Sequence, residues 1–245
     1  MPHFYVKPKD IVGGQFRISG EEAHHIIRVL RYKKGQEINL FDGSGQIYMG
    51  KIEEILKDEL KGTIINKKEG KIPKIRINLY QSIPKGERFD WLIEKSAELG
   101  VKRVIPIYTE RSVVRNISVS KIGRWQRISL GACEQSNRAD IMDVSAPLDL
   151  TEALKGLPLN STSIIPWESE NIKTFEDIIN ANKLPEEVNI FIGPEGGFSN
   201  REIEIAVSKN VIPVTLGPRI LRVETAGLLS VVLVMNLAGE YNGSR

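Results

Sequence analysis

Hydrophobic and polar residues follow one pattern in the first 70 or so residues of the chain and a different one beyond them. In the first region, short alternating or β-rich stretches are separated by turn signals such as GG, KKG, DGSG and KDE, which is typical of a small barrel or sandwich. The predicted strands are HFYV (3–6), QFRI (15–18), EINLF (37–41), QIYMGKI (46–52) and LKGTIIN (60–66).

One helix is predicted inside this region, over residues 21–31. Ser19 with Glu22 three residues later is the signature of a capping box at its start. The helix would bury one apolar stripe and expose a continuous polar face at positions i, i+4 and i+7. That face suits a phosphate backbone, although an ordinary solvated face gives the same pattern. The stripe is Ala23, Ile26, Ile27 and Leu30, and the polar face is His24, Arg28 and Arg31, followed by Lys33 and Lys34.

The sequence NKKEGKIPK (66–74) separates the two patterns. It is polar and contains glycine and proline, so we expect a linker there. A chain of 245 residues is long enough for two domains. We therefore expect one domain over residues 1–70 and a second over 74–245.

The second region begins with a strand, a helix and another strand, IRINLYQSI (75–83), FDWLIEKSAEL (89–99) and VKRVIPIY (101–108), with Gly100 ending the helix. This β-α-β order predicts a parallel sheet covered by helices. Helices near 119–137 and 151–156 follow. Three further strands are predicted at TSIIP (162–166), VNIFIG (188–193) and VIPVTLG (211–217).

The amino-acid composition argues against several kinds of site and segment. All three histidines lie within the first 25 residues, so a Ser-His-Asp triad or a histidine-rich metal site in the second region is unsupported. The lone Cys133 forms no internal disulfide and is expected to be a bystander thiol. No apolar run is long enough to span a membrane, and the start MPHFYVKPKD lacks the apolar core of a signal peptide, so we expect a cytoplasmic protein.

Charge is distributed unevenly, although the net charge is only +3. Residues 1–72 contain 13 basic and 10 acidic side chains, and the remainder contains 21 of each. Within the second region, residues 101–138 contain eight basic and two acidic side chains, whereas 139–210 contain five and thirteen. These local changes in net charge are compatible with a nucleic-acid partner, and they are equally compatible with an ordinary solvated surface.

Three loops follow the predicted strands of the second region: Pro166–Ser169, GPEGGFS (193–199) and GPRILRVET (217–225). Ligands of parallel sheets bind beyond the carboxyl ends of the strands, and glycine allows close approach of the backbone. Ser199 and Glu202 form a second capping-box signature, so the glycine loop leads to a helix N-terminus that suits a phosphate. Neither GxGxxG nor GxxxxGK[ST] is present. The loops indicate a cradle for a small, neutral-to-cationic, nucleotide-like ligand, and two tight turns are the alternative.

Five segments together resemble the bacterial ribosomal RNA small subunit methyltransferase E family. They are HHIIRVLR (24–31), EKSAELGV (94–101), CEQSNR (133–138), IGPEGGFS (192–199) and LGPRILRVETA (216–226). The likeness extends through both expected domains in order, and the two loop motifs are far more specific than a lone glycine signature.

The resemblance implies an α/β fold class: an N-terminal PUA-like, RNA-binding β-barrel, then a SPOUT-type α/β domain with a parallel sheet and a C-terminal trefoil knot. General rules of chain topology disfavour a knot, so this expectation rests on the resemblance alone. A homodimer, S-adenosyl-L-methionine as cofactor, no metal, and methylation of N3 of a uridine in small-subunit (16S) ribosomal RNA are also implied. The apolar segment TAGLLSVVLVMNLAG (225–239) fits a dimer contact or a helix fully buried in one copy.

The resemblance also implies site residues. Uracil N3 must lose a proton, which a carboxylate can take, and a cation near the imide oxygens can stabilise the anion. Arg222 is the predicted cation, and Arg219 is assigned to a phosphate or to the loop. Glu195 or Glu224 is predicted to face the sulfonium or act as base, although Glu224 also suits the dipole of its helix. The predicted cofactor-binding residues are Pro166, Gly193, Gly197, Leu216, Gly217, Leu221, Thr225 and Ala226.

Two other functions remain open from the residues themselves. A non-catalytic RNA-binding or ribosome-assembly protein with the same fold would keep the basic surfaces. A nucleotide-dependent oxidoreductase is disfavoured by the missing dinucleotide fingerprint and by the absence of histidine beyond residue 25. Trp167 lies beside the first loop and is interpreted as a core or interface residue in preference to a cofactor contact.

Overall fold

The computed structural model describes residues 2–181 and 185–242, which form two compact units. The first unit comprises Met1–Ile72 with Leu130–Ile141, and the second comprises Pro73–Ser129 with Met142–Arg245. The later segment joins the first unit through backbone contacts: the amide of Gly45 donates to the carbonyl of Ala139 at 3.0 Å. The boundary between the units therefore divides one helix, α3 (Val119–Gln135).

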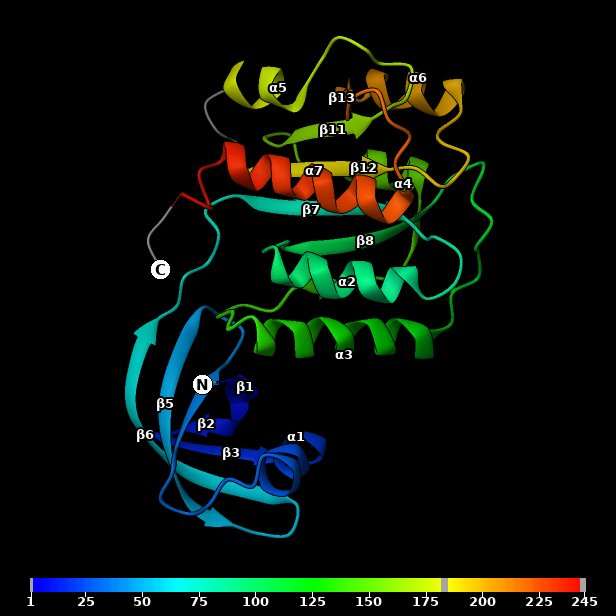
Figure 1. The fold of residues 1–245 in the computed structure, drawn as a ribbon. Helices are drawn as coiled ribbons and strands as arrows, with labels where there is room; N and C mark the ends of the chain where they lie inside the picture. Colours follow the sequence, from blue (N-terminus) through cyan, green and yellow to red (C-terminus); the bar gives the residue numbers. More distant parts are fainter. Residues whose placement is uncertain (1, 182–184, 243–245) are drawn as a thin grey trace. The chain divides into compact units, whose positions relative to one another are not determined.

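The first unit is a six-stranded sheet in the order β1-β4-β5-β6-β3-β2 (Figure 1). The pair β1–β4 is parallel and the other pairs are antiparallel. All five predicted strands are present in it. The bounds are β1 His3–Tyr5, β2 Ile11–Val12, β3 Gln15–Ser19, β4 Glu37–Phe41, β5 Gln46–Ile55 and β6 Glu59–Glu69, with a short 3-10 helix at Pro8–Asp10.

The core of this unit is formed around Phe16, which the long strands β5 and β6 cover closely. A Cβ atom at Gly50 or Gly62 would lie 2.5 or 2.6 Å from Cε1 of Phe16, so both strands need glycine there. The expected linker is partly wrong, because residues 66–69 are the last residues of β6. They remain in the sheet because β5 extends far enough to pair Gln46 with Glu69.

The helix predicted over 21–31 differs from the expectation. An α-helix spans only Glu21–His24 (α1), and a π-helical turn, His25–Val29, follows it. The predicted capping box is wrong because Ser19 pairs with Glu59 as the last residue of β3, and Gly20, with φ 75°, is the N-cap. Ala23 and Ile26 are buried as predicted, but Leu30 is 40% exposed.

The second unit is a parallel sheet in the order β10-β8-β7-β12-β11-β13, with β9 also paired to β8. The predicted β-α-β unit and parallel sheet are confirmed. The strands are β7 Arg76–Ser82, β8 Arg103–Tyr108, β9 Asp143–Val144, β10 Leu148–Asp149, β11 Thr162–Pro166, β12 Glu187–Ile192 and β13 Val211–Val214.

Helices cover both faces of this sheet (Figure 1). Helix α7 packs on β7 and β12 and contacts α2 and α5, whereas α6 packs on β13 and α4 packs on β8 and β10. The alternation of side chains explains the two layers: Tyr80 packs in the core with α4 and α6, and its neighbour Gln81 faces α7. The helices are α2 Arg88–Glu98, α4 Leu150–Lys155, α5 Phe175–Ala181, α6 Asn200–Ser208 and α7 Val223–Leu237.

Helix α7 approaches the sheet very closely at Gly227. A Cβ atom at that position would lie 2.3 Å from Oε1 of Gln81 in β7, so a larger residue would force either the buried Gln81 side chain or the helix to shift. Although α7 is apolar on most of its surface, none of the helices in the described ranges has the length and hydropathy of a membrane span.

Candidate active site

The active-site cavity lies beyond the carboxyl ends of three adjacent strands. Strand β11 lies between β12 and β13. The chain therefore adds β12 on one side of β11 and then crosses back to add β13 on the other side. Such a reversal of strand order opens a crevice at the carboxyl ends. The three loops that follow these strands line one cavity of about 450 Å³. The structure therefore brings the glycine loop (193–199) and the loop 215–222 to the same cavity.

The predicted catalytic and cofactor-binding residues line this cavity, and Thr225 and Glu224 are the exceptions. Thr225 is exposed in the first turn of α7, where Arg222 and Ala226, four residues apart, contribute to the cavity instead. The predicted residues in the lining are Pro166, Gly193, Glu195, Gly197, Leu216, Gly217, Leu221, Arg222 and Ala226, and Trp167 and Arg219 also contribute.

The glycine loop is held in one shape by its own backbone and by Phe198. Gly197 has φ 66°, which favours glycine, and its amide donates to the carbonyl of Pro194 at 2.9 Å. A Cβ atom at Gly193 would lie 3.0 Å from the buried ring of Phe198. These two glycines therefore let the loop turn tightly over an apolar anchor.

Two further contacts attach the glycine loop to the segment after β8. The predicted capping box is confirmed: the amide of Glu202 donates to Oγ of Ser199, and the amide of Ser199 donates to Oε2 of Glu202. The other carboxylate oxygen of Glu202 accepts from the amide of Glu110 at 2.8 Å. Nη1 of Arg111 donates to the carbonyl of Gly196 at 2.6 Å. Both carboxylate oxygens of the buried Glu202 therefore accept a backbone hydrogen bond.

The loop 215–222 is much more open. The amide of Gly217 donates to Oγ1 of Thr215 at 3.1 Å, and Gly217 itself has φ 88° with no atom within 4 Å of an added Cβ. Arg219, Ile220 and Arg222 are exposed, and Ile220 is 97% exposed. Arg222 is also the N-cap residue of α7, and its carbonyl accepts from the amide of Ala226. Two cations therefore stand at the rim of the cavity.

A buried carboxylate lies directly behind this rim. Glu224 is 7% exposed, and its Oε1 lies 3.8 Å from Nε of Arg88. Its Oε2 is buried without a hydrogen-bond partner in the described part of the chain. Arg88 lines the cavity, but Glu224 does not. Of the two carboxylates considered from the sequence, only Glu195 faces the cavity, and its Oε1 accepts from the amide of Lys85 at 3.3 Å.

Sequence reasoning missed several side chains of the site, and three of them are charged. Arg88 and Glu168 line the cavity, and Arg111 clamps the glycine loop. Glu168 stands in the first of the three predicted loops, and Arg111 follows a strand whose carboxyl end lies at the same edge of the sheet. Their positions directly after strands are the sequence signals that could have identified Glu168 and Arg111 as site residues. Nothing in the local pattern indicates Arg88, because only the packing of α2 beside α7 brings it to the cavity.

The predicted RNA-binding residues belong to the first unit. His24, Arg28 and Arg31 are all exposed. They do not follow the regular α-helical spacing, because the π-helical turn intervenes and Arg31, with φ 58°, lies beyond its end. The expectation of one straight helical face is therefore wrong, while the role of these side chains in RNA binding remains a prediction.

Family comparison places both units in known families. Residues 71–235 match the RNA methyltransferase domain family, and residues 18–65 match the RNA methyltransferase PUA domain family. The fold and the crevice at the strand ends agree with this assignment. The chain is therefore an RNA methyltransferase with a PUA-like domain and an α/β domain built on a parallel sheet. It belongs to the ribosomal RNA small subunit methyltransferase E family.

Individual relatives support this membership over nearly the full chain. Ribosomal RNA small subunit methyltransferase E of Buchnera aphidicola (subsp. Schizaphis graminum) is 32% identical over 99% of this chain and 98% of the relative. The same protein of Aquifex aeolicus is 33% identical over 89% and 92%. The crystal structure of the Neisseria gonorrhoeae protein bound to S-adenosyl methionine has a TM-score of 0.88 at 32% identity, over 97% of this chain and 98% of that one.

Proposed function

We propose that the chain transfers a methyl group from S-adenosyl-L-methionine to N3 of a uridine in small-subunit (16S) ribosomal RNA. One observation carries the proposal: the glycine loop and the loop 215–222 line one cavity of about 450 Å³ in a chain of this family. A relative of 32% identity and TM-score 0.88 binds S-adenosyl methionine. A cavity of this volume is within the range of small-molecule sites.

The residues of the cavity fit this cofactor. Leu216, Leu221 and Ala226 provide an apolar surface for the adenine ring, and Gly193 and Gly197 allow close approach of the backbone. Glu168 and Glu195 provide negative charge that suits a sulfonium group. When bound, the cofactor supplies a methyl group that is already activated toward a nucleophile.

The remaining chemistry concerns the uridine. Its N3 proton has to be removed, and the negative charge that develops on the imide has to be stabilised. In this proposal Glu195 accepts the proton and Arg222 stabilises the anion, because both face the cavity. Glu224 is the poorer base, because it does not line the cavity and its carboxylate lies beside Arg88.

The first domain, residues 1–70, holds the RNA in this proposal, and residues 74–245 carry out methyl transfer. His24, Arg28 and Arg31 contact phosphates, since all three are exposed and two of them are arginines. Arg219 contributes a further phosphate contact at the rim of the cavity. A cytoplasmic location is part of this proposal, because an enzyme that modifies ribosomal RNA acts where that RNA is found.

The active form is a homodimer in this proposal, and the C-terminal segment forms a trefoil knot. Helix α7 leaves apolar side chains partly exposed, and Trp91 on the neighbouring helix α2 is 48% exposed. A second copy would cover such a surface. The partly exposed apolar residues of α7 are Leu228, Leu229, Val232 and Leu233.

A methyl-transfer assay tests the proposal. The chain is incubated with radiolabelled S-adenosyl-L-methionine and small-subunit RNA, either naked or in assembled subunits, and the product nucleosides are identified by mass spectrometry. We expect 3-methyluridine at one site. The Gly217→Trp variant should remain folded and lose cofactor binding in calorimetry, with Gly86→Trp as a control outside the cavity. RNA binding without any methyl transfer would instead support a ribosome-assembly protein.

A further inference from the structure

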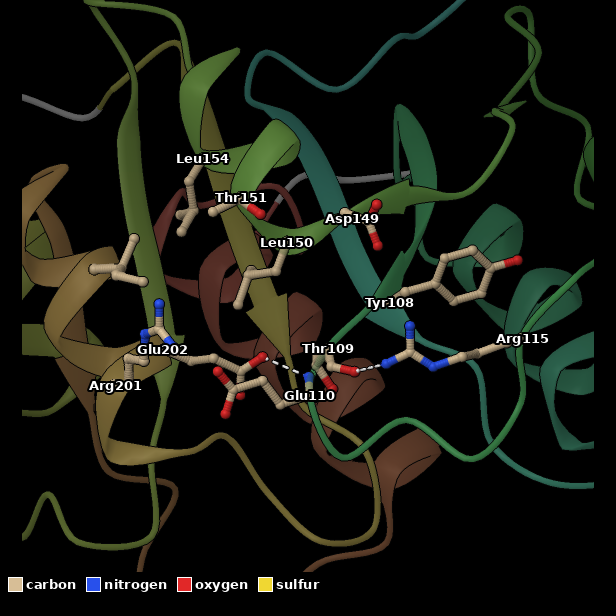
Figure 2. A pocket seen from close by; sticks show the side chains of 11 residues that line it. Tyr108, Thr109, Glu110, Arg115, Asp149, Leu150, Thr151, Leu154, Arg201 and Glu202 are labelled. Carbon is tan, nitrogen blue, oxygen red and sulfur yellow. Dashed lines mark hydrogen bonds between the residues drawn. The ribbon is translucent and has the colours of Figure 1, made fainter.

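A second cavity opens at the same edge of the parallel sheet, and it shares no lining residue with the active-site cavity. Its volume is about 280 Å³. It lies at the ends of β8 and β10, and the first turns of α4 and α6 close its sides (Figure 2). We call it the Tyr108 cavity. Its lining is Tyr108, Thr109, Glu110, Arg115, Asp149, Leu150, Thr151, Leu154, Arg201, Glu202 and Ile205.

The inner surface of the Tyr108 cavity is apolar and includes one aromatic ring. Leu150 and Leu154 of α4 are almost fully buried, and Ile205 of α6 is partly buried. The ring of Tyr108 is partly buried, and its hydroxyl accepts from the amide of Ile117 at 3.2 Å, which fixes its orientation. A flat ring beside aliphatic side chains is a surface on which a nucleobase can stack.

Charged groups stand at the rim. The guanidinium of Arg115 lies 5.9 Å from the centroid of the Tyr108 ring, and its Nη2 donates to the carbonyl of Thr109 at 2.5 Å. A guanidinium has five N–H donors, so this bond leaves others for a ligand. Arg201 is exposed, and no carboxylate in the described ranges forms an ion pair with it. Asp149, also exposed, supplies an acceptor for a base amine or imide.

The Tyr108 cavity and the active-site cavity share a structural element. Residues 192–195, 197 and 198 line the active-site cavity, and Arg201 and Glu202, a few residues further along the chain, line the Tyr108 cavity. Figure 2 shows the hydrogen bond from the amide of Glu110 to Glu202, the residue that also caps the glycine loop. The glycine loop and the start of α6 therefore connect the two cavities at one edge of the sheet.

We propose that the Tyr108 cavity binds a nucleotide of the RNA substrate that flanks the methylated uridine, with its base against Tyr108 on the side of Arg115 and its phosphate at Arg201 on the opposite side (Figure 2). The inference rests on the proposed function insofar as the ligand is the RNA substrate. A free inorganic anion would leave the apolar floor unused, and a purely apolar ligand would leave the two arginines unused. The volume accommodates one base and excludes a drug-sized ligand.

Filling the cavity tests the proposal. Thr151 is an exposed lining residue of α4, so Thr151→Trp places a large ring in the cavity without removing a core side chain. Glu152→Trp adds the same ring at the adjacent exposed position, outside the lining, and is the matched control. We expect Thr151→Trp to raise the KM for RNA about tenfold, the loss of one stacked base, with kcat and S-adenosyl-L-methionine affinity equal to those of the control.

A second pair of variants protects the test against misfolding of Thr151→Trp. Arg201→Ser removes the cation at the rim, and Lys209→Ser removes an exposed cation at the other end of the same helix. RNA affinity is measured by fluorescence anisotropy across salt concentrations. Arg201→Ser should make the slope of log affinity against log salt shallower by about 0.7 to 0.9, the value of one phosphate contact, and Lys209→Ser should leave it unchanged.

The outcomes separate this inference from the proposed function. If the wild type binds RNA without methyl transfer, while Thr151→Trp weakens the binding, the function fails and the nucleotide site stands. If the wild type transfers methyl groups and Thr151→Trp equals Glu152→Trp in both assays, with the salt slope of Arg201→Ser unchanged, the nucleotide site is wrong. A defect of Thr151→Trp on assembled subunits but not on naked RNA would indicate a protein ligand and overturn the inference.

Discussion

The two glycine-containing walls of the active-site cavity are built in opposite ways. The glycine loop is attached on several sides: Arg111 binds its carbonyl at Gly196, and both oxygens of Glu202 accept backbone hydrogen bonds. The loop 215–222 has an exposed Ile220 at its tip and a hydrogen bond from Gly217 to Thr215. Behind it, Glu224 is buried with one oxygen that lacks a partner. One wall is an anchored support, and the other presents cations to an incoming ligand.

This contrast suggests that the two walls have different roles in binding. An anchored backbone can hold a small cofactor with little entropic cost on binding, because its conformation is already set. An open loop with two arginines can adapt to a large and irregular substrate such as folded RNA. We therefore expect loss of the exposed arginines of the open wall to affect the chemistry and RNA binding, and loss of the contacts that anchor the glycine loop to affect stability and cofactor affinity.

The largest effect is expected from Arg222→Ala in the open wall. Removing a group that stabilises a developing anion reduces kcat by a factor of about 100 to 1,000. Because the side chain is exposed at the rim, cofactor affinity should change little. Single-turnover methyl transfer and calorimetry measure the two quantities. Arg219→Ala is the control, and it should alter the KM for RNA without a comparable loss of rate; equal losses of rate in the two variants would contradict the assignment.

Glu202→Ala should have the next largest effect, on stability. It leaves the partly buried amides of Ser199 and Glu110 without their acceptor, which costs about 2 kcal/mol in the free energy of unfolding. Chemical denaturation measures this loss. Glu204→Ala, at an exposed position of the same helix, should change stability by less than about 0.5 kcal/mol. Similar values for both variants would mean that the wall is not anchored through Glu202.

Arg111→Ala should loosen the glycine loop without unfolding the protein. The lost hydrogen bond to Gly196 is expected to weaken S-adenosyl-L-methionine about tenfold, equivalent to about 1.4 kcal/mol. Arg111→Lys keeps a donor and should restore part of the affinity. Calorimetry at constant pH measures the change. Full affinity in the alanine variant would show that the loop holds its shape unaided.

The smallest effect is expected from Glu134 in the first unit, a half-buried carboxylate that is less well satisfied than Glu202. Burial, together with the nearby Glu22, raises its pKa to about 7, although it accepts from the amide of Tyr5. Between the unfolded value of 4.5 and this value the folded state binds more protons, so stability falls as pH rises. We expect the wild type to lose about 1 kcal/mol between pH 5 and 6 relative to Glu134→Gln. Parallel stability curves for the two proteins would contradict this.

Most of the secondary structure could be predicted because its signals are local. Strand β11 occupies the predicted residues, and the capping box of Ser199 and Glu202 forms as the spacing requires. The same spacing failed at Ser19 and Glu22, because Ser19 remains in the ladder with Glu59 and Gly20 becomes the cap. A motif four residues long does not encode which of two neighbours leaves the sheet first.

The candidate site divides in the same way. The local order of residues is enough to predict that glycine and proline loops follow buried strands, because turn chemistry and hydrophobic runs are properties of neighbouring residues. Long-range packing, in contrast, places β11 between β12 and β13, brings Arg88 of α2 to the cavity, and lets Arg111 reach Gly196. It also directed Ala226 and not Thr225 into the lining. Strand order and helix packing depend on contacts between distant residues, which no local pattern specifies.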